Sequence, residues 1–248
     1  MATINNINTS SLLELFEKVF FKNGYEISTR WDDFDNHFKG LYKGNLTFIT
    51  GNPSIGKSNF LLYLIYYITR NDDNILFFSL QSNRYKLINT LREMLNVTVL
   101  DLIKLRNNEL TEDEEALWNE KLRIFERIFI THSCNYETLY DSVKTFLQTN
   151  KDTKVIFIDA MDNISNPEYI TYTTACRLLK QIAIDFDIPV VVTTANTPEN
   201  MEKIFIFADV IIEIYKENDK DIYPYVKTIK NNNAPTNDDK FLFNFPLF

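Results

Sequence analysis

One segment of the chain joins an apolar run, a glycine-containing loop and a second apolar run. Residues 46–50 read L-T-F-I-T, residues 51–58 read G-N-P-S-I-G-K-S, and a longer apolar run begins at Phe60. The first run predicts a buried strand that ends at Thr50, and the second predicts a helix that begins near Lys57. A strand, a tight loop and a helix in this order favour an α/β fold with helices packed on a parallel sheet.

The loop between the two runs has the composition of an anion-binding turn. Gly51 and Gly56 let the backbone fold back so that its N–H groups point into a concave site. In the pattern G-x-x-x-x-G-K-S, the lysine reaches the β- and γ-phosphates and the serine hydroxyl ligates Mg²⁺, so these roles fall to Lys57 and Ser58. The following helix adds the positive end of its dipole. The predicted nucleotide-binding residues are Gly51, Asn52, Pro53, Ser54, Ile55, Gly56, Lys57, Ser58 and Asn59.

A glycine turn that happens to precede a lysine is the weaker interpretation of this loop. The chain has five glycines, and two of them occupy the two glycine positions of the pattern. The pattern also lies in the strand–loop–helix context that phosphate binding requires. We therefore expect a site for ATP and Mg²⁺.

A second element fits the same site. Residues 155–158 (V-I-F-I) are apolar, and Asp159 follows them directly. A carboxylate at the end of such a strand, beside the phosphate loop, holds Mg²⁺ through water or by way of Ser58. Many buried strands end in aspartate, so the pattern gains weight only because it follows the phosphate loop. It predicts a metal site formed by Ser58 and Asp159.

The rest of the chain alternates between apolar strand patterns and helical patterns. This alternation predicts right-handed βαβ crossovers and a mostly parallel central sheet flanked by helices. Three late strands, at 209–216, 222–229 and 240–245, have no helix between them, so we expect antiparallel pairing at that edge. The other predicted strands span 45–50, 75–80, 128–131, 154–158 and 190–194, and the main predicted helices span 57–69, 83–95, 99–105, 111–127, 136–148 and 171–186.

Two units are expected along the chain. Residues 1–27 form an N-terminal extension, in which 11–22 carry apolar residues at helical spacing. Residues 28–248 form the α/β domain, a size that suits a single domain.

Bulk properties restrict the partners and the compartment. The net charge is −8 and no long basic block exists, which disfavours a whole-surface grip on nucleic acid. No apolar run approaches the roughly 20 residues of a membrane span, and no signal peptide is evident. The two cysteines, Cys134 and Cys176, lack metal-ligand spacing, and with His37 and His132 as the only histidines no zinc set can be assembled. We expect a cytoplasmic protein with reduced thiols.

Taken together, the motifs resemble the C-terminal, RecA-like motor domain of DnaB-type replicative DNA helicases. Residues 28–58 resemble the lead-in and phosphate loop of that family, and residues 76–80 (L-F-F-S-L) resemble the strand that carries its catalytic glutamate. Residues 157–159 resemble its Walker B strand, 188–191 the entry to its sensor strand, and 208–215 its A-D-L-I strand.

The resemblance spans roughly residues 28–245 and implies a RecA-like P-loop NTPase that uses ATP and Mg²⁺. It also implies single-stranded DNA as a partner and a homo-oligomer in which nucleotide lies between subunits. The family's N-terminal domain has no counterpart in these residues, and residues 11–22 lie where its interdomain linker helix would be.

The chain departs from the family at the position of the general base. The family has glutamate after S-L, whereas this chain has Gln81. An amide cannot accept the proton of the attacking water, and loss of a general base typically costs about 10²–10⁴-fold in rate. Catalysis through Lys57 and Gln81 is therefore expected to be impaired. Asp162, Glu199 or Glu202 would be substitute carboxylates, Asp162 the best of them, although D-A-M-D-N reads more simply as a solvated loop.

Three further departures affect turnover and DNA contact. The family's sensor strand ends in Ser-Gln, and the equivalent stretch of this chain is Thr193, Thr194 and Ala195. Lys230 matches the first residue of the family's K-x-R pair and is a possible contact to a neighbouring subunit, but Asn232 replaces the arginine. Such an arginine is worth about 10³–10⁵-fold. The loop 195–207 is short and holds one basic residue.

These features leave three functions open. The first is a DnaB-like ATP-binding protein, related to DNA replication or mobile-element DNA, with weak or absent hydrolysis. The second is a non-enzymatic scaffold or regulator derived from a helicase motor domain. The third and weakest is a small-molecule kinase, which would need an arginine-rich lid that the sequence does not provide.

Overall fold

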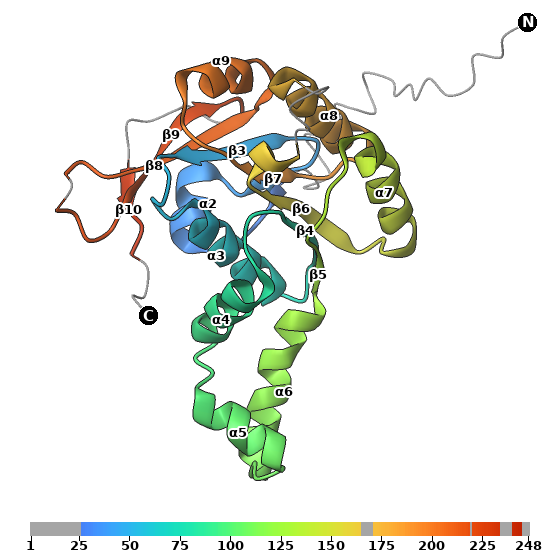
Figure 1. Ribbon diagram of the computed structural model, residues 1–248, viewed down its shortest axis with the longest axis vertical. Coiled ribbons are helices and arrows are strands. Elements are labelled where there is room, and N and C mark those ends of the chain that lie inside the picture. The colour runs from blue at the N-terminus through green and yellow to red at the C-terminus, as the bar shows by residue number, and fades with distance from the viewer. Residues whose placement is uncertain (1–25, 165–170, 219, 234–239, 245–248) are drawn as a thin grey trace, which may run out of the picture.

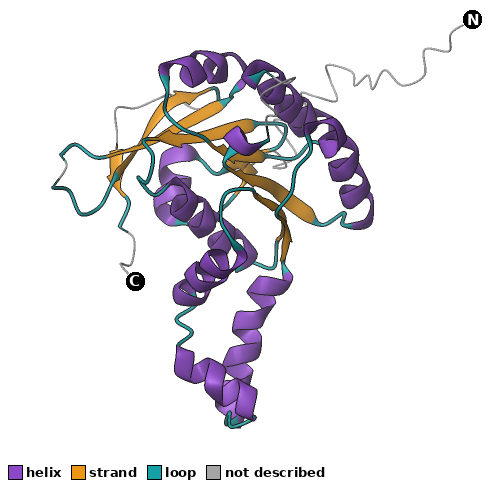
Figure 2. Ribbon diagram, viewed as in Figure 1, coloured by secondary structure: helices purple, strands orange, loops and turns teal. Residues whose placement is uncertain are grey.

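A mixed eight-stranded sheet forms the centre of the molecule, with helices on both of its faces (Figures 1 and 2). The computed structural model describes residues 26–164, 171–218, 220–233 and 240–244. The predicted helix at 11–22 lies outside these residues, and of the predicted extension 1–27 only Glu26–Ile27 is described, so that prediction stays open.

The strand order within the sheet is β10-β9-β8-β3-β7-β6-β4-β5. The run from β8 to β5 is parallel throughout. At the other edge β9 pairs antiparallel with β8, and β10 pairs antiparallel with β9. The expected fold class, including the antiparallel C-terminal edge, is confirmed. The strands are β1 (Glu26–Ile27), β2 (Leu41–Tyr42), β3 (Leu46–Gly51), β4 (Asn74–Ser79), β5 (Ile128–Thr131), β6 (Thr153–Asp159), β7 (Val190–Thr193), β8 (Val210–Tyr215), β9 (Tyr225–Asn231) and β10 (Lys240–Leu242).

The helices follow the predicted segments within a few residues. They are α2 (Asp32–Phe38), α3 (Lys57–Thr69), α4 (Arg84–Met94), α5 (Val99–Asn107), α6 (Glu112–Glu126), α7 (Tyr136–Thr149), α8 (Tyr172–Asp185) and α9 (Pro198–Phe207), with a short 3₁₀ turn, η1, at Met161–Asn163. The main difference is α2, which the sequence reading missed because it is only seven residues long.

Two hydrophobic cores cover the two faces of the sheet, and alternation along the strands divides the side chains between them. In β6, Val155 and Phe157 face the core built on α3, whereas Ile156 and Ile158 face the core that includes α7 and α8. Burial on both faces explains why this strand is continuously apolar. The phosphate-loop strand β3 lies between β7 and β8, so its carboxyl end is held from both sides.

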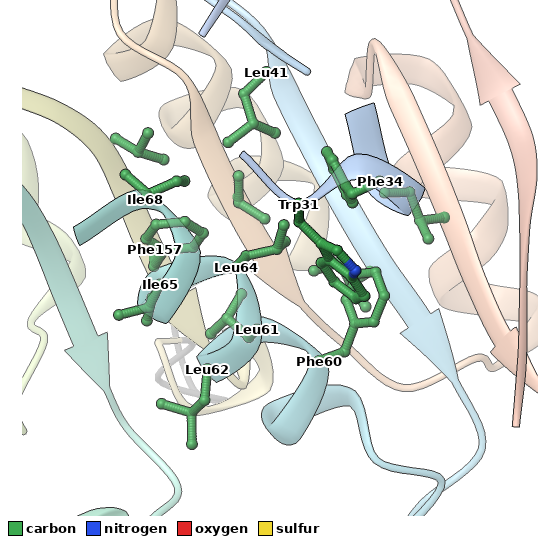
Figure 3. Close-up of a cluster of buried hydrophobic side chains, with 14 of the residues drawn as sticks. Trp31, Phe34, Leu41, Phe60, Leu61, Leu62, Leu64, Ile65, Ile68 and Phe157 are labelled. Atoms are coloured by element: carbon green, nitrogen blue, oxygen red, sulfur yellow. The ribbon is translucent and has the colours of Figure 1, made fainter. Parts of the chain in front are cut away.

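An aromatic cluster fixes the lead-in segment to the α3 face (Figure 3). The Trp31 side chain is buried, and its ring centroid lies 5.2 Å from that of Phe60. The same ring stacks on Tyr67 with a centroid distance of 5.6 Å. The Asp35 carboxylate organises the preceding turn because it accepts hydrogen bonds from the backbone N–H groups of Thr29 and Arg30.

Helices α5 and α6 extend away from the sheet as a helical hairpin (Figure 1). A capping box opens α6, where the Thr111 hydroxyl accepts from the Glu114 N–H and the Glu114 carboxylate accepts from the Thr111 N–H. Lys104 of α5 and Glu114 form an ion pair of 2.5 Å that joins the two helices. Among the described helices, none is long and apolar enough to cross a bilayer.

The aromatic cluster yields a stability prediction. Trp31→Ala removes a buried ring from a packed core, so we expect the free energy of unfolding to fall by about 3–5 kcal/mol. Tyr85→Ala is the matched control, because Tyr85 is 84% exposed and its loss should change stability by less than about 0.5 kcal/mol. Urea denaturation followed by circular dichroism measures both values. Equal losses in the two variants would show that the cluster does not support the fold.

Candidate functional site

The phosphate loop lies at the carboxyl end of β3 and continues into α3, as predicted. Gly56 precedes the first residue of α3 with φ of 109°. Gly51 has φ of 155°, and a Cβ at this position would lie 2.4 Å from the backbone oxygen of Ile214 on β8. Ser54 is also left-handed, with φ of 63°. These conformations bend the loop sharply between the strand and the helix N-terminus, where backbone N–H groups favour anions.

The Lys57 side chain curls back over this loop. Its Nζ donates to the backbone oxygens of Gly51 and Asn52, both at 2.9 Å. Burial lowers the pKa of the Lys57 ammonium, and the nearby charges of Asp162 and Asp159 oppose that shift. The cation is therefore held at the loop by neutral carbonyl groups, which are weaker partners than the ionised oxygens of a phosphate.

The two predicted metal residues touch each other. Ser58 Oγ donates to Asp159 Oδ1 at 2.9 Å, and Thr193 Oγ1 donates to the same oxygen at 2.7 Å. The backbone N–H of Ala160 in turn donates to Thr193 Oγ1 at 2.7 Å. Because β7 lies between β3 and β6 in the sheet, Thr193 at its end bridges the Walker B aspartate to the rest of the site. A hydroxyl beside a buried carboxylate is an oxygen donor set that fits Mg²⁺.

A cleft of about 700 Å³ opens beside these residues. The loops that follow β3, β4, β6 and β7 all contribute to its lining, as expected at the carboxyl edge of a parallel sheet. Its lining residues are Pro53, Ser54, Gly56, Lys57, Ser58, Asn59, Gln81, Ser82, Asn83, Lys86, Ala160, Asp162, Asn163, Thr193, Thr194 and Ala195. Most of the predicted loop residues and Gln81 thus share one cleft.

Three predicted loop residues have other roles around the cleft. Ile55 packs against the hydrophobic core on the α3 face. Gly51 and Asn52 lie behind the lining, where their backbone oxygens hold Lys57. The sequence analysis did not name Ser82, Asn83, Ala160 and Asn163, although their positions soon after two predicted strands were a usable signal, nor did it name Lys86 in the first turn of α4.

The structure also changes the interpretation of the candidate substitute carboxylates. Asp162 is exposed, as a solvated loop residue would be, but it lines the cleft. Glu199 is paired with Lys203 at 2.5 Å, and neither Glu199 nor Glu202 is among the lining residues. Of the three candidate substitute carboxylates, only Asp162 therefore lines the cleft.

Lys230 is engaged within its own chain. Its Nζ donates to the backbone oxygens of Phe205 at 3.0 Å and Ala208 at 2.5 Å, at the end of α9. A contact with a neighbouring subunit would require these bonds to be exchanged, and it stays a prediction. Asn232 directly follows β9, and its backbone N–H donates to the backbone oxygen of Asp209 at 2.9 Å.

The His132 and Cys134 pair lies elsewhere, at the end of β5. His132 Nδ1 is 3.2 Å from the backbone oxygen of Ser79, and burial raises the pKa of the Cys134 thiol to about 11. Within the described residues, no three histidine, cysteine, aspartate or glutamate side chains form a metal-binding group.

Sequence comparison assigns this fold and site to a family. Residues 26–202 match the profile of the DnaB-like helicase C terminal domain. The chain belongs to this family. A probable replicative DNA helicase of Guillardia theta is 27% identical over 202 residues, which cover 77% of this chain and 33% of the relative. The replicative DNA helicase DnaB of Helicobacter pylori is 23% identical over 178 residues, which cover 66% of this chain and 35% of that protein.

This DnaB-like chain therefore spans about a third of the length of these two relatives. Its fold matches solved structures at 16% identity. The ATPase domain of G40P superimposes with a TM-score of 0.70 over 93% of this chain and 92% of that domain. A DnaB-like replicative helicase, solved in a study of its interactions with primase, gives 0.72 over 96% of this chain and 66% of the other. These matches establish the RecA-like fold.

The close approach at Gly51 generates a prediction about the phosphate loop. Gly51→Ala forces a Cβ against the Ile214 carbonyl, so we expect the backbone to shift and the free energy of unfolding to fall. Gly44→Ala is the control, because Gly44 also has positive φ, of 74°, but an added Cβ would meet its nearest atom only at 4.0 Å. The control should lose about 1–2 kcal/mol from the left-handed conformation alone.

Urea denaturation of the two glycine variants separates the clash from the conformational strain. Gly51→Ala should lose clearly more stability than Gly44→Ala. Equal losses would contradict the assigned contact between β3 and β8.

Proposed function

We propose that this DnaB-like domain binds ATP with Mg²⁺ in the cleft and hydrolyses it slowly or not at all. The observation that carries the proposal is the 2.9 Å hydrogen bond between Ser58 and Asp159, at the mouth of a glycine loop that also holds Lys57. The loop N–H groups and the Lys57 ammonium would hold the β- and γ-phosphates. Ser58 and Asp159 would hold Mg²⁺, which neutralises phosphate charge when bound.

Two side chains also support the proposal that ATP hydrolysis is slow. Gln81 lines the cleft, at the position where the family carries its general base. An amide can orient a water molecule but cannot accept its proton, so the carboxylate contribution of about 10²–10⁴-fold is missing at this position. Asn232 likewise lacks the charge that an arginine finger supplies.

The proposed biological setting is DNA replication or the maintenance of mobile-element DNA. The family membership and the two relatives named as replicative helicases support it. Single-stranded DNA and a homo-oligomer are the corresponding proposed partners. DNA affinity should be modest, because the net charge is −8 and the segment 195–207 carries one lysine.

A non-enzymatic scaffold is the second candidate. Gln81, Ala195 and Asn232 all depart from groups that act in turnover, whereas the phosphate loop and Asp159 are intact. Binding and hydrolysis use separable groups. A domain with this pattern would use ATP as a structural ligand.

The first test concerns binding. Lys57→Ala removes the charged partner of the phosphates, so affinity for Mg²⁺ with a slowly hydrolysed ATP analogue should fall on the order of 10²-fold. Lys144→Ala is the control, since Lys144 is an exposed lysine of α7 outside the cleft lining. Titration calorimetry measures both. Wild-type affinity in Lys57→Ala would remove the proposal.

The second test concerns turnover. Steady-state phosphate release should be weak in the wild-type protein, with or without single-stranded DNA. Gln81→Glu restores a carboxylate at the end of β4, so the rate should rise, by at most about 10²–10⁴-fold. Strong DNA-stimulated turnover by the wild type would rule out the scaffold candidate. No gain in Gln81→Glu would contradict the view that Gln81 limits the rate.

A further inference from the structure

One carboxylate faces the cleft although the expected glutamate is missing. Of the described residues that line it, Asp162 alone carries a carboxylate, since Asp159 is buried behind Ser58 and Thr193. Gln81 lines the same cleft and cannot accept a proton. A proton acceptor for hydrolysis, if the protein has one among these residues, is therefore at position 162.

The turn that carries Asp162 is fixed at both ends. Ala160, which precedes the η1 turn, has φ of 67°, a left-handed conformation uncommon for a residue other than glycine. Its N–H is held by Thr193 Oγ1 at 2.7 Å. On the other side, Asn163 Nδ2 donates to the backbone oxygen of Leu80 at 3.2 Å. These bonds place Asp162 between the ends of β4 and β7, where it lines the same cleft as Gln81.

Polar side chains orient the Asp162 carboxylate. Thr194 Oγ1 lies 3.4 Å from both carboxylate oxygens, and Asn200 Nδ2 lies 3.5 Å from Oδ1. The Tyr172 hydroxyl bonds Thr194 Oγ1 at 2.6 Å and so fixes the rotamer of that threonine. The Thr194 and Asn200 side chains therefore hold the Asp162 carboxylate at the rim of the cleft. Its charge also acts on the Lys57 ammonium across the cleft.

We propose that Asp162 is the general base of the slow hydrolysis, a role that rests on the proposed binding of ATP in this cleft. The oxygen of a water molecule bonds to the γ-phosphorus while one of its protons passes to Asp162. The bond between the γ-phosphorus and the β–γ bridging oxygen breaks, and its electron pair leaves on ADP. The exposed carboxylic acid then returns its proton to solvent. Thr194, Asn200 and Tyr172 are positioning residues.

The test compares Asp162→Asn with Glu202→Gln, a control that removes an exposed carboxylate outside the cleft lining. Single-turnover hydrolysis, affinity for a slowly hydrolysed ATP analogue and thermal stability are measured for both variants and the wild type. Asp162→Asn should lower the hydrolysis rate about 10²-fold or more and leave affinity and stability within about threefold and a few degrees of wild type. Glu202→Gln should match the wild type in all three.

Four results would overturn the proposal. The first is an Asp162→Asn variant that hydrolyses ATP at the wild-type rate. The second is an Asp162→Asn variant whose hydrolysis rate recovers in excess Mg²⁺, which would indicate that Asp162 holds the metal. Wild-type protein that binds the analogue but shows no turnover is the third, and it leaves the proposed binding function intact. Wild-type protein that does not bind the analogue is the fourth, and it removes the proposed function as well.

Discussion

The site depends on a single carboxylate oxygen that accepts hydrogen bonds from two different parts of the chain. Asp159 Oδ1 accepts one hydrogen bond from the Ser58 hydroxyl at the start of α3 and another from the Thr193 hydroxyl at the end of β7. Asp159 is buried, and a buried carboxylate is tolerated only where donors satisfy it. This contact holds the phosphate loop, the Walker B strand and the strand between them in one arrangement, and the cleft opens where they meet.

The sheet makes that contact possible. Parallel pairing of β3 with β7, and of β7 with β6, places three carboxyl ends at one edge. The segments at these ends, together with the one that follows β4, supply the polar groups that line the cleft. At the same edge, Gly51 allows β3 to approach β8 so closely that no side chain fits. The motif residues that this chain keeps are therefore those that shape the loop and the cleft, whereas its departures from the family, such as Gln81 and Asn232, lie at positions to which the proposed function assigns water activation and a contact between subunits.

Local patterns account for what the sequence could predict. The loop 51–58, the apolar run before Asp159 and the helix predicted over 111–127 each depend on residues close together in the chain, and each was found. The position of Asp162 was not, because it depends on the left-handed conformation of Ala160 and on Thr193 from another strand. The bonds of Lys230 to the end of α9 were missed for the same reason, since they join segments more than twenty residues apart.

The central claim is that this edge of the sheet is built to hold a triphosphate and a divalent ion. A crystal structure of the protein with Mg²⁺ and a non-hydrolysable ATP analogue tests it most directly. The account predicts that Lys57 leaves the carbonyls of Gly51 and Asn52 for the phosphates, and that the ion binds Ser58 beside Asp159. A nucleotide bound away from the loop, or a Lys57 still on its carbonyls with the analogue present, would contradict it.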